Sequence, residues 1–252
     1  MARDWEQLAD WYDKKQGDSG DLWHRALIDP VLVRLVGDVK GLTVLDVGCG
    51  NGYLARRFAK AGAKVTAVDS SARMIKNGRA HDRENVLKIR YVRSDASSLE
   101  KLRDESFDLA YANMSLMDVD DAEGMISEVS RVLRERGRFV ASISHPCFDI
   151  MSNSGWVREK VISEPPKVYR KVRGYREPFG QVVPWTLSKD KVMWTTGFHR
   201  PLNWYARAFK SSGMAITALE EPEPTKEFME LESDAPGFLE VPLHLVIEAM
   251  KL

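Results

Sequence analysis

The sequence predicts an α/β fold, with a mostly parallel, doubly wound sheet of seven strands that helices cover on both faces. Short apolar runs alternate with helical patterns along most of the chain, as expected of strand–helix–strand units. The runs are apolar at successive positions, which is typical of strands that are buried on both faces. A length of 252 residues suits one such domain with an insertion.

Composition and charge narrow the class of protein further. Lysine plus arginine and aspartate plus glutamate number 37 each, so no net charge attracts nucleic acid or an anionic membrane. The two cysteines, Cys49 and Cys147, are too few for a disulfide framework, and the amino-terminal residues lack the apolar stretch of a secretory signal. No apolar run reaches the roughly 20 residues that cross a bilayer. We therefore expect a cytoplasmic protein without membrane insertion.

The sheet is predicted from seven apolar runs. In chain order these strands are residues 42–47, 64–69, 87–93, 107–113, 138–144, 215–220 and 243–250. Periodic apolar positions predict helices at residues 53–61, 71–80, 120–134 and 202–212. A proline-rich segment, residues 221–224, joins the last two strands, which we expect to give the sheet an antiparallel end.

The chain divides into four parts. They are a helical lid at residues 1–39, a ligand-binding core at 40–145, an insertion at 146–200 and a part that completes the sheet at 201–252. Two amphipathic patterns, at residues 5–12 and 21–36, predict the helices of the lid, which could lie over the ligand edge of the sheet. In the insertion, after the fifth strand, prolines and aromatic residues replace the regular alternation.

A glycine-rich turn is the strongest functional signal. The strand at residues 44–47 runs directly into Gly48, Gly50 and Gly52, and a helix follows. Glycine permits positive φ and lets a ligand approach the backbone closely. A tight turn without a ligand would explain one glycine better than three. The turn lacks the Gly-Lys-Ser/Thr of a P-loop, and its spacing differs from the G-x-G-x-x-G of dinucleotide-binding proteins.

Two carboxylates indicate the kind of ligand. Asp46 directly precedes the glycines, where it would disfavour a pyrophosphate but suit a cationic ligand. Asp69 ends the second strand, where a carboxylate can accept both hydroxyls of a ribose. The pattern therefore predicts a nucleoside-like ligand with a positive charge near the ribose.

Over residues 40–145 the chain resembles the class I S-adenosylmethionine-dependent methyltransferases, which have a Rossmann-like fold. The resemblance implies that the glycine loop cradles the methionine part of the cofactor with Asp46, Gly48, Cys49, Gly50 and Gly52. It implies that ribose and adenine are bound by Asp69, Ser70, Met74, Asp95 and Ala96. The end of the fourth strand, Asn113 and Met114, would face the methionine end. S-adenosylmethionine is the implied cofactor and S-adenosylhomocysteine its product.

The two ends of the chain resemble the small-molecule methyltransferases of the ubiquinone-biosynthesis type. The matching segments are residues 198–205, with the order His-Arg-Pro-Leu, and the Glu-Pro repeat at 221–224; Met214 departs from the usual aromatic residue. The start of the chain, residues 5–13, resembles the lid of that family. From this resemblance we expect substrate contacts from Tyr12, His24, Trp194 and Arg200.

Methyl transfer from a sulfonium is a direct displacement, so alignment and exclusion of water are the main requirements. A general base is needed only if the acceptor is protonated. Among the candidate bases, His145 follows the fifth strand but could instead cap it, and His199 could instead orient its loop. His24 has the pattern of a packed or solvated residue.

Asp118 is the remaining candidate base. It follows the fourth strand, in the region where related enzymes often place a polar group that faces the substrate. It could instead cap the next helix, although Asp120 or Asp121 is better placed for that role. No cysteine and histidine spacing suggests a zinc site, and we expect no metal.

The insertion leaves several kinds of partner open. Basic residues interleave with Trp156, Tyr169 and Tyr175, a pattern found in solvated hairpins, in contacts to aromatic or anionic small molecules, and in RNA-binding segments. The basic residues are Arg158, Lys160, Lys167, Arg170, Lys171, Arg173 and Arg176. Zero net charge disfavours RNA, and the Asn-Pro-Pro-Tyr sequence of nucleic-acid amino methyltransferases is absent after the fourth strand.

The favoured function is methyl transfer to an oxygen or nitrogen of a small molecule. Methylation of RNA or protein, a non-catalytic cofactor-binding scaffold and, on fold grounds alone, a dehydrogenase are the alternatives. We expect a monomer or a homodimer.

Overall fold

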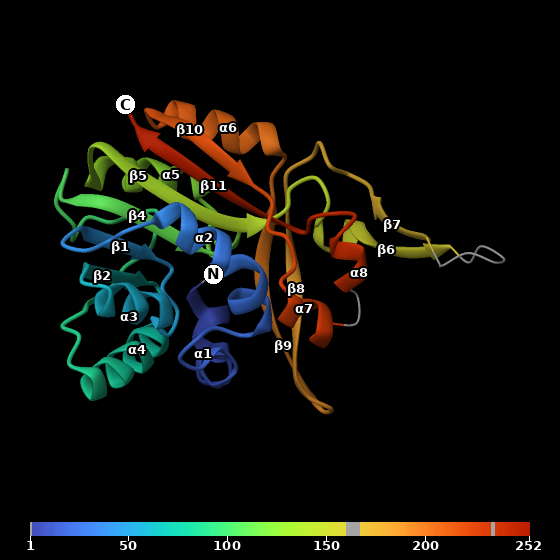
Figure 1. Ribbon diagram of the computed structural model, residues 1–252, viewed down its shortest axis with the longest axis horizontal. Helices are drawn as coiled ribbons and strands as arrows, with labels where there is room; N and C mark the ends of the chain where they lie inside the picture. Colours follow the sequence, from blue (N-terminus) through green and yellow to red (C-terminus); the bar gives the residue numbers. More distant parts are fainter. Residues whose placement is uncertain (1, 160–166, 233–234) are drawn as a thin grey trace.

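The computed structural model describes residues 2–159, 167–232 and 235–252. A seven-stranded sheet in the order β10-β11-β5-β4-β1-β2-β3 forms its centre (Figure 1). The strands are β1 Thr43–Val47, β2 Lys64–Asp69, β3 Arg90–Arg93, β4 Phe107–Asn113, β5 Leu133–Ser144, β10 Met214–Glu220 and β11 His244–Lys251. Strand β11 runs antiparallel to both of its neighbours, β10 and β5, and the other strand pairs of this sheet are parallel. The predicted mostly parallel sheet with an antiparallel end is confirmed.

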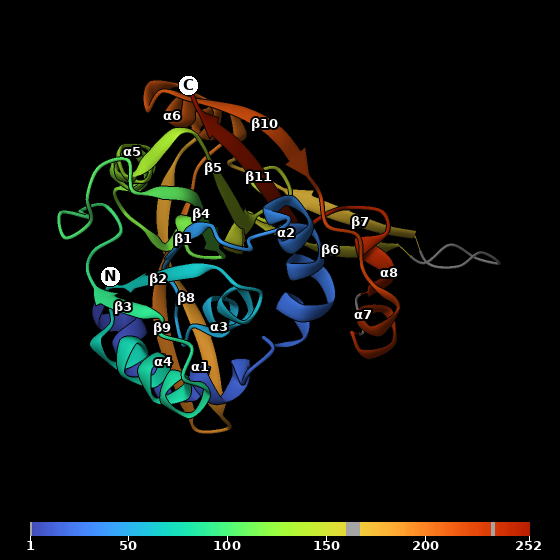
Figure 2. The ribbon, with the colours of Figure 1, turned by 60° about the vertical axis from the view of Figure 1, so that its left-hand side comes forward.

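Helices cover both faces of this sheet, because alternate residues of each strand point to opposite sides. The helices are α2 Asp29–Val36, α3 Tyr53–Lys60, α4 Ala72–Asn85, α5 Ala122–Val132 and α6 Leu202–Ser211. In β1, Leu45 and Val47 belong to a buried cluster with α5 and α6. Val44 belongs to a second cluster on the opposite face, with α2, α3 and α4. The doubly wound arrangement therefore rests on two separate apolar layers, and the helices that cover the sheet are visible in Figure 2.

Several predicted boundaries shift. The third strand begins at Arg90 instead of residue 87, and α4 extends to Asn85 instead of ending at residue 80. The fifth strand begins at Leu133, directly after α5, because Leu133 pairs with Phe107 of β4 before the pairing shifts register. In the described parts of the chain, no helix is long and apolar enough to cross a membrane.

The amino-terminal part covers the carboxyl edge of the sheet. Helix α1, Ala2–Gln16, lies against α4 and against a hairpin of the insertion (Figure 2). The segment predicted as one helix at 21–36 contains a π-helical turn, His24–Ile28, which runs directly into α2. The lid thus has the two predicted helical segments, with a longer first helix and a wider, π-helical turn at the start of the second.

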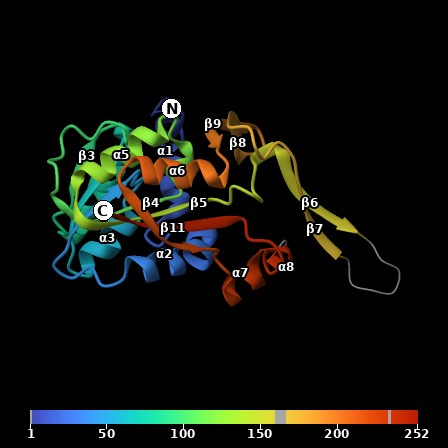
Figure 3. The ribbon, with the colours of Figure 1, turned by 90° about the horizontal axis from the view of Figure 1, so that it is seen from above.

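The insertion folds mainly into two antiparallel hairpins. They are β6 Ser154–Glu159 with β7 Lys167–Val172, and β8 Phe179–Ser188 with β9 Lys191–His199. The first hairpin projects away from the sheet, whereas the second lies along α1 (Figures 1 and 3). Lys160 of the predicted basic run lies outside the described residues. Short helical segments complete the chain: η2 Leu116–Asp118, η3 Met151–Asn153, α7 Lys226–Leu231 and α8 Ala235–Phe238.

Candidate active site

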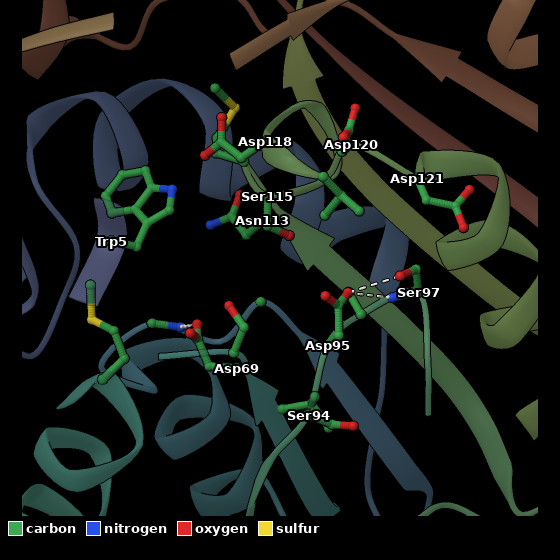
Figure 4. Close-up of a pocket in the computed structure, with 18 of the residues that line it drawn as sticks. Trp5, Asp69, Ser94, Asp95, Ser97, Asn113, Ser115, Asp118, Asp120 and Asp121 are labelled. Carbon is green, nitrogen blue, oxygen red and sulfur yellow. Dashed lines mark hydrogen bonds between the residues drawn. The ribbon is translucent and has the colours of Figure 1, made fainter. Parts of the chain in front are cut away.

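A cavity of about 560 Å³ opens at the carboxyl edge of the sheet, with α1 forming one wall. The predicted site residues that line it are Tyr12, Gly48, Gly50, Asp69, Ser70, Met74, Asp95, Ala96, Asn113, Met114 and Asp118. The lining residues that the sequence did not single out as site residues are Trp5, Val68, Ser94, Ser97, Ser115, Val119, Asp120 and Asp121. Figure 4 shows Asp69 and Asp95 on one side of the cavity, and Trp5 and Asp118 on the other.

Each of the three loop positions requires glycine for a different structural reason. Gly48 has φ of 76°, and a Cβ there would lie 2.5 Å from Cβ of Ser115. Gly50 has φ of 53° with open space where a Cβ would lie, so its backbone is accessible to a ligand. A Cβ at Gly52 would lie 2.6 Å from the Tyr91 hydroxyl. Gly52 does not line the cavity, which corrects the expectation that all three glycines admit a ligand.

Asp69 is held in place at the end of β2. Its two carboxylate oxygens accept hydrogen bonds from the backbone N–H of Gly50 at 2.9 Å and of Ser71 at 2.8 Å. Burial raises its pKa to about 6, although these two bonds favour the charged form. A carboxylate has about four acceptor positions, so Asp69 keeps capacity for ribose hydroxyls. The side chain therefore fits the predicted role.

Asp95 lies at the same end of the cavity, after β3. Its Oδ1 accepts hydrogen bonds from the backbone N–H and the hydroxyl of Ser97, at 3.0 and 2.9 Å. These bonds fix the turn that also brings Ser94 and Ala96 to the cavity wall. The loops after β2 and β3 thus form one continuous polar end of the cavity.

Asp46 lies behind the glycine loop. It is 2 % exposed, and the Tyr111 hydroxyl donates to its carboxylate at 2.7 Å. Burial raises its pKa to about 8. Together with Cys49 and His24 it borders a smaller cavity of about 40 Å³ instead of the main one. The two cavities share lining residues, Tyr12, Gly48, Gly50 and Asn113.

Asn113, at the end of β4, has all of its polar atoms engaged. Its amide donates to Asp29 at 2.9 Å and to the Tyr53 hydroxyl at 2.8 Å, and its carbonyl accepts from Ser142 at 2.6 Å. These bonds hold the strand end at the border of both cavities. The side chain therefore shapes the site, and its two amide hydrogens are already used by protein groups.

Asp118 faces the cavity from the short helical turn after β4. It is partly buried, and burial raises its pKa to about 7, an effect that the indole of Trp5 opposes. The helix cap is supplied by Asp121, whose carboxylate accepts from the Gly124 N–H at 2.8 Å. Asp118 is therefore free from that structural role and is the candidate base that the structure brings to the cavity.

An aromatic wall closes the side of the cavity that α1 forms. The ring of Trp5 lies 5.1 Å from that of Tyr12, and both contact Trp185 of β8 edge to face, at 5.5 and 6.0 Å. The Trp185 indole donates to Thr195 Oγ1 at 2.8 Å. The spacing of Trp5 and Tyr12, seven residues apart, already placed both on one face of a helix. The contact to the insertion could not be found from the sequence.

The two histidines predicted as bases lie outside this cavity. His145 is 3 % exposed; its Nδ1 accepts from the Cys147 N–H at 3.1 Å and its Nε2 lies 2.9 Å from Glu221. His199 holds the Tyr175 carbonyl through Nε2 at 2.8 Å and borders a separate small cavity of about 30 Å³. Burial lowers the pKa of both rings. Their hydrogen bonds hold both rings away from the main cavity, so the structure does not bring them to Asp118.

Three residues that we expected to contact the substrate also lie outside the main cavity. His24 borders the small cavity and hydrogen-bonds to Asp21 at 2.8 Å. Trp194 is 52 % exposed and does not line the cavity. Arg200 lies against the loop that follows Asp118. Its guanidinium donates to the carbonyls of Val119 and Asp120, both at 2.7 Å. Arg200 thus holds the loop that follows Asp118 instead of touching a ligand in the cavity.

Comparisons with known proteins agree with this geometry. Residues 45–141 match the family described as a methyltransferase domain. The ubiquinone biosynthesis O-methyltransferase of Xanthomonas oryzae pv. oryzae is 34% identical over 115 residues, which are 46% of this chain and 47% of that protein. The demethylmenaquinone methyltransferase of Renibacterium salmoninarum is 34% identical over 127 residues, 50% of this chain and 49% of that protein. The chain spans about half the length of these curated relatives.

A solved structure extends the likeness along the chain. The S-adenosylmethionine-dependent methyltransferase of Mesorhizobium loti superposes with a TM-score of 0.70 at 28% identity, covering 88% of this chain and 96% of that one. The class predicted from the sequence, a class I S-adenosylmethionine-dependent methyltransferase, is confirmed for the part of the chain that these comparisons cover. Within it, residues 45–141 form a methyltransferase domain.

Proposed function

We propose that this protein transfers a methyl group from S-adenosylmethionine to an oxygen or nitrogen of a small-molecule acceptor. The observation that carries the proposal is the single cavity in which the residues predicted to bind the nucleoside, Asp69 and Asp95, lie opposite Asp118 and an aromatic wall. The curated relatives named for ubiquinone and menaquinone biosynthesis support a small-molecule acceptor.

The residues present fit S-adenosylmethionine. Asp69 keeps acceptor capacity for the ribose, and the loop after β3, with Asp95 and Ala96, would hold the adenine. Gly50 presents open backbone to the methionine part, and Asp46 lies behind that loop as an acidic partner for its ammonium group. When bound, the cofactor supplies a methyl group on a positively charged sulfur that is a good leaving group.

The remaining chemistry belongs to the protein side chains. Asp118, with its pKa near neutrality, can accept the proton that an acceptor hydroxyl or ammonium must lose. Trp5 and Tyr12 present apolar surface that excludes water from the acceptor side. The arrangement therefore supplies alignment, water exclusion and a base, which are the requirements of methyl displacement.

A binding experiment tests the cofactor. We expect S-adenosylmethionine and S-adenosylhomocysteine to raise the melting temperature, whereas NAD and ATP leave it unchanged; saturation at 100 times Kd stabilises by about 2.7 kcal/mol. Asp69→Asn should weaken this shift, and Asp190→Asn, in the exposed turn of β8 and β9, should not. A shift with NAD alone, or a folded protein that binds none of the four, would refute the proposal.

A further inference from the structure

The acceptor side of the cavity has an unusual charge pattern. Five aspartates line the cavity, and two of them, Asp69 and Asp95, lie at the nucleoside end. Asp118, Asp120 and Asp121 remain on the acceptor side. Among the described residues that line the cavity there is no lysine, arginine or histidine. An anionic acceptor would therefore meet only like charge at this wall.

Two cationic side chains close to this part of the molecule, Arg200 and Lys15, have contacts outside the cavity. Arg200 donates to two backbone carbonyls behind the acceptor loop, and its guanidinium lies 4.8 Å from the ring centroid of Trp204. Lys15 lies 3.4 Å from Asp21, and its Nζ is 5.6 Å from the ring centroid of Trp185, outside the cavity lining. Burial and the Trp5 indole are the influences on the Asp118 pKa, with no contribution from a cation. No lysine, arginine or histidine of the described chain therefore lines the cavity beside Asp118.

The aromatic wall beside Asp118 supplies a second element of recognition. Trp5 and Tyr12 both line the cavity, and Trp185 holds their rings in place from behind. The face of an aromatic ring attracts a cation by about 0.5–2 kcal/mol, more where water is excluded. A carboxylate next to aromatic rings, with no competing cation, is a combination that favours an organic ammonium ion.

We propose that the methyl acceptor is a small amine that enters as its ammonium form, with the charged nitrogen at Asp118 and an apolar body against Trp5 and Tyr12. This inference rests on the proposed function and narrows its acceptor to nitrogen. Hydroxyl compounds would lack the charge that Asp118 attracts, and carboxylic acids would be repelled.

The proton and charge balance is complete with these groups. Asp118, as the carboxylate, accepts one proton from the ammonium and leaves a neutral amine with a free electron pair. That pair forms the new bond between nitrogen and the methyl carbon, while the electrons of the broken carbon–sulfur bond go to sulfur. The products are a methylammonium ion and the neutral thioether S-adenosylhomocysteine, and the proton on Asp118 passes to water when the product leaves.

Binding of matched probes tests the acceptor class without turnover. We would titrate phenethylamine, 2-phenylethanol and 3-phenylpropionate into the protein with S-adenosylhomocysteine and follow the fluorescence of its tryptophans. We expect the amine to bind at least tenfold more tightly than either analogue. Asp118→Asn should remove that preference and retain S-adenosylhomocysteine binding, and the surface variant Asp190→Asn should behave as wild type.

The outcomes separate the two proposals. Equal or tighter binding of the alcohol or the acid would overturn the amine acceptor, while binding of S-adenosylhomocysteine would leave methyl transfer in place. Failure to bind S-adenosylhomocysteine would refute the proposed function itself. Should Asp118→Asn fail to fold, Trp5→Leu serves as the second variant, because loss of the ring face should weaken phenethylamine more than 2-phenylethanol. An equal loss for both probes would contradict the proposal.

Discussion

Asp46 is a buried carboxyl group that accepts a hydrogen bond from the Tyr111 hydroxyl, and its burial disfavours the charged form. With a pKa of about 8, it is mostly protonated at neutral pH in the ligand-free protein. A cation placed next to it would favour the ionised form instead. The group is therefore able to couple the charge of a ligand to proton release.

We predict that S-adenosylmethionine binding releases a proton at pH 7, because the ammonium group of its methionine part favours ionised Asp46. The affinity should accordingly rise as pH increases from 6 to 8. Calorimetry in two buffers of different ionisation enthalpy measures the released proton directly. In Asp46→Asn the proton release should be absent, and an unchanged release in that variant would contradict the assignment.

We predict that kcat/KM falls roughly tenfold per pH unit below about 7, since burial raises the pKa of the proposed base, Asp118, to about 7. Asp118→Asn should lower kcat by about 10²–10⁴-fold with the cofactor Kd unchanged. A pH–rate profile of both proteins, with an acceptor in excess, checks this. If the rate of Asp118→Asn still fell below pH 7 as in wild type, the base would be another group.

At the scale of elements, the loop after β1 owes two of its glycines to packing. The hydroxyl of Tyr91 is buried without a partner among the described residues and lies where a Cβ of residue 52 would be. We predict that Gly52→Ala lowers the free energy of unfolding by about 2–4 kcal/mol, as strain of positive φ adds to overlap. Gly41→Ala, with φ of 81° but open space around it, should cost only about 1 kcal/mol in the same denaturation experiment. If both variants lost the same free energy of unfolding, contact with Tyr91 would not be the reason for glycine at residue 52.

Helix α1 is held over the cavity from two sides. Glu6 accepts from the Ser71 hydroxyl at 2.7 Å, Asp10 pairs with Arg73, and Trp185 packs on the aromatic face of the helix. These contacts connect the lid to the loop after β2 and to the insertion. The wall of the acceptor side is thus built from three separate segments of the chain.

We predict that Trp185→Ala raises the acceptor KM roughly tenfold, as loss of about 1.4 kcal/mol of edge-to-face contact would. Trp185 does not line the cavity, so it acts by positioning Trp5 and Tyr12. Faster amide hydrogen exchange in α1 should accompany the change. Trp194→Ala, half exposed on the paired strand, should leave both quantities unchanged, and an effect there would restore it as a substrate contact.

At the scale of the whole molecule, the buried carboxyl groups determine how the free energy of unfolding depends on pH. The folded pKa values of Asp46 and Asp118, about 8 and 7, exceed the unfolded value of about 3.9, so the folded ligand-free protein binds more protons between pH 6.5 and 8. Burial lowers the pKa of His244 to about 3, so this ring stays neutral across that window.

We predict that the free energy of unfolding of the ligand-free protein falls as pH rises from 6.5 to 8, by up to about 1.4 kcal/mol per pH unit for a fully buried group such as Asp46. Chemical denaturation at a series of pH values measures the slope. Asp46→Asn should flatten it. The same slope in wild type and in Asp46→Asn would show that Asp46 is already ionised without ligand.

The sequence predicts the sheet well because each strand carries its own signal, as the buried run of β2 and the polar residue that ends it, Asp69, illustrate. The nucleoside end of the cavity follows for the same reason, since it lies directly after predicted strands. The acceptor side of the cavity cannot be predicted in this way, because Trp5 contacts Trp185 only after the insertion folds back on α1. The positions of His145 and His199 could not be predicted because their partners, the Glu221 carboxylate and the Tyr175 carbonyl, belong to distant segments.

The division between the two sides of the cavity bears on how such proteins diversify. Asp69 and Asp95 lie within the matched segment 45–141, whereas Trp5, Tyr12 and Trp185 lie outside it. Exchange of the amino-terminal helix and one hairpin would therefore alter the aromatic wall against which the acceptor packs and leave Asp69, Asp95 and Asp118 in place. A chimera with these two segments from another methyltransferase offers a route to transplanting specificity, provided that both are exchanged together, since their rings pack on one another.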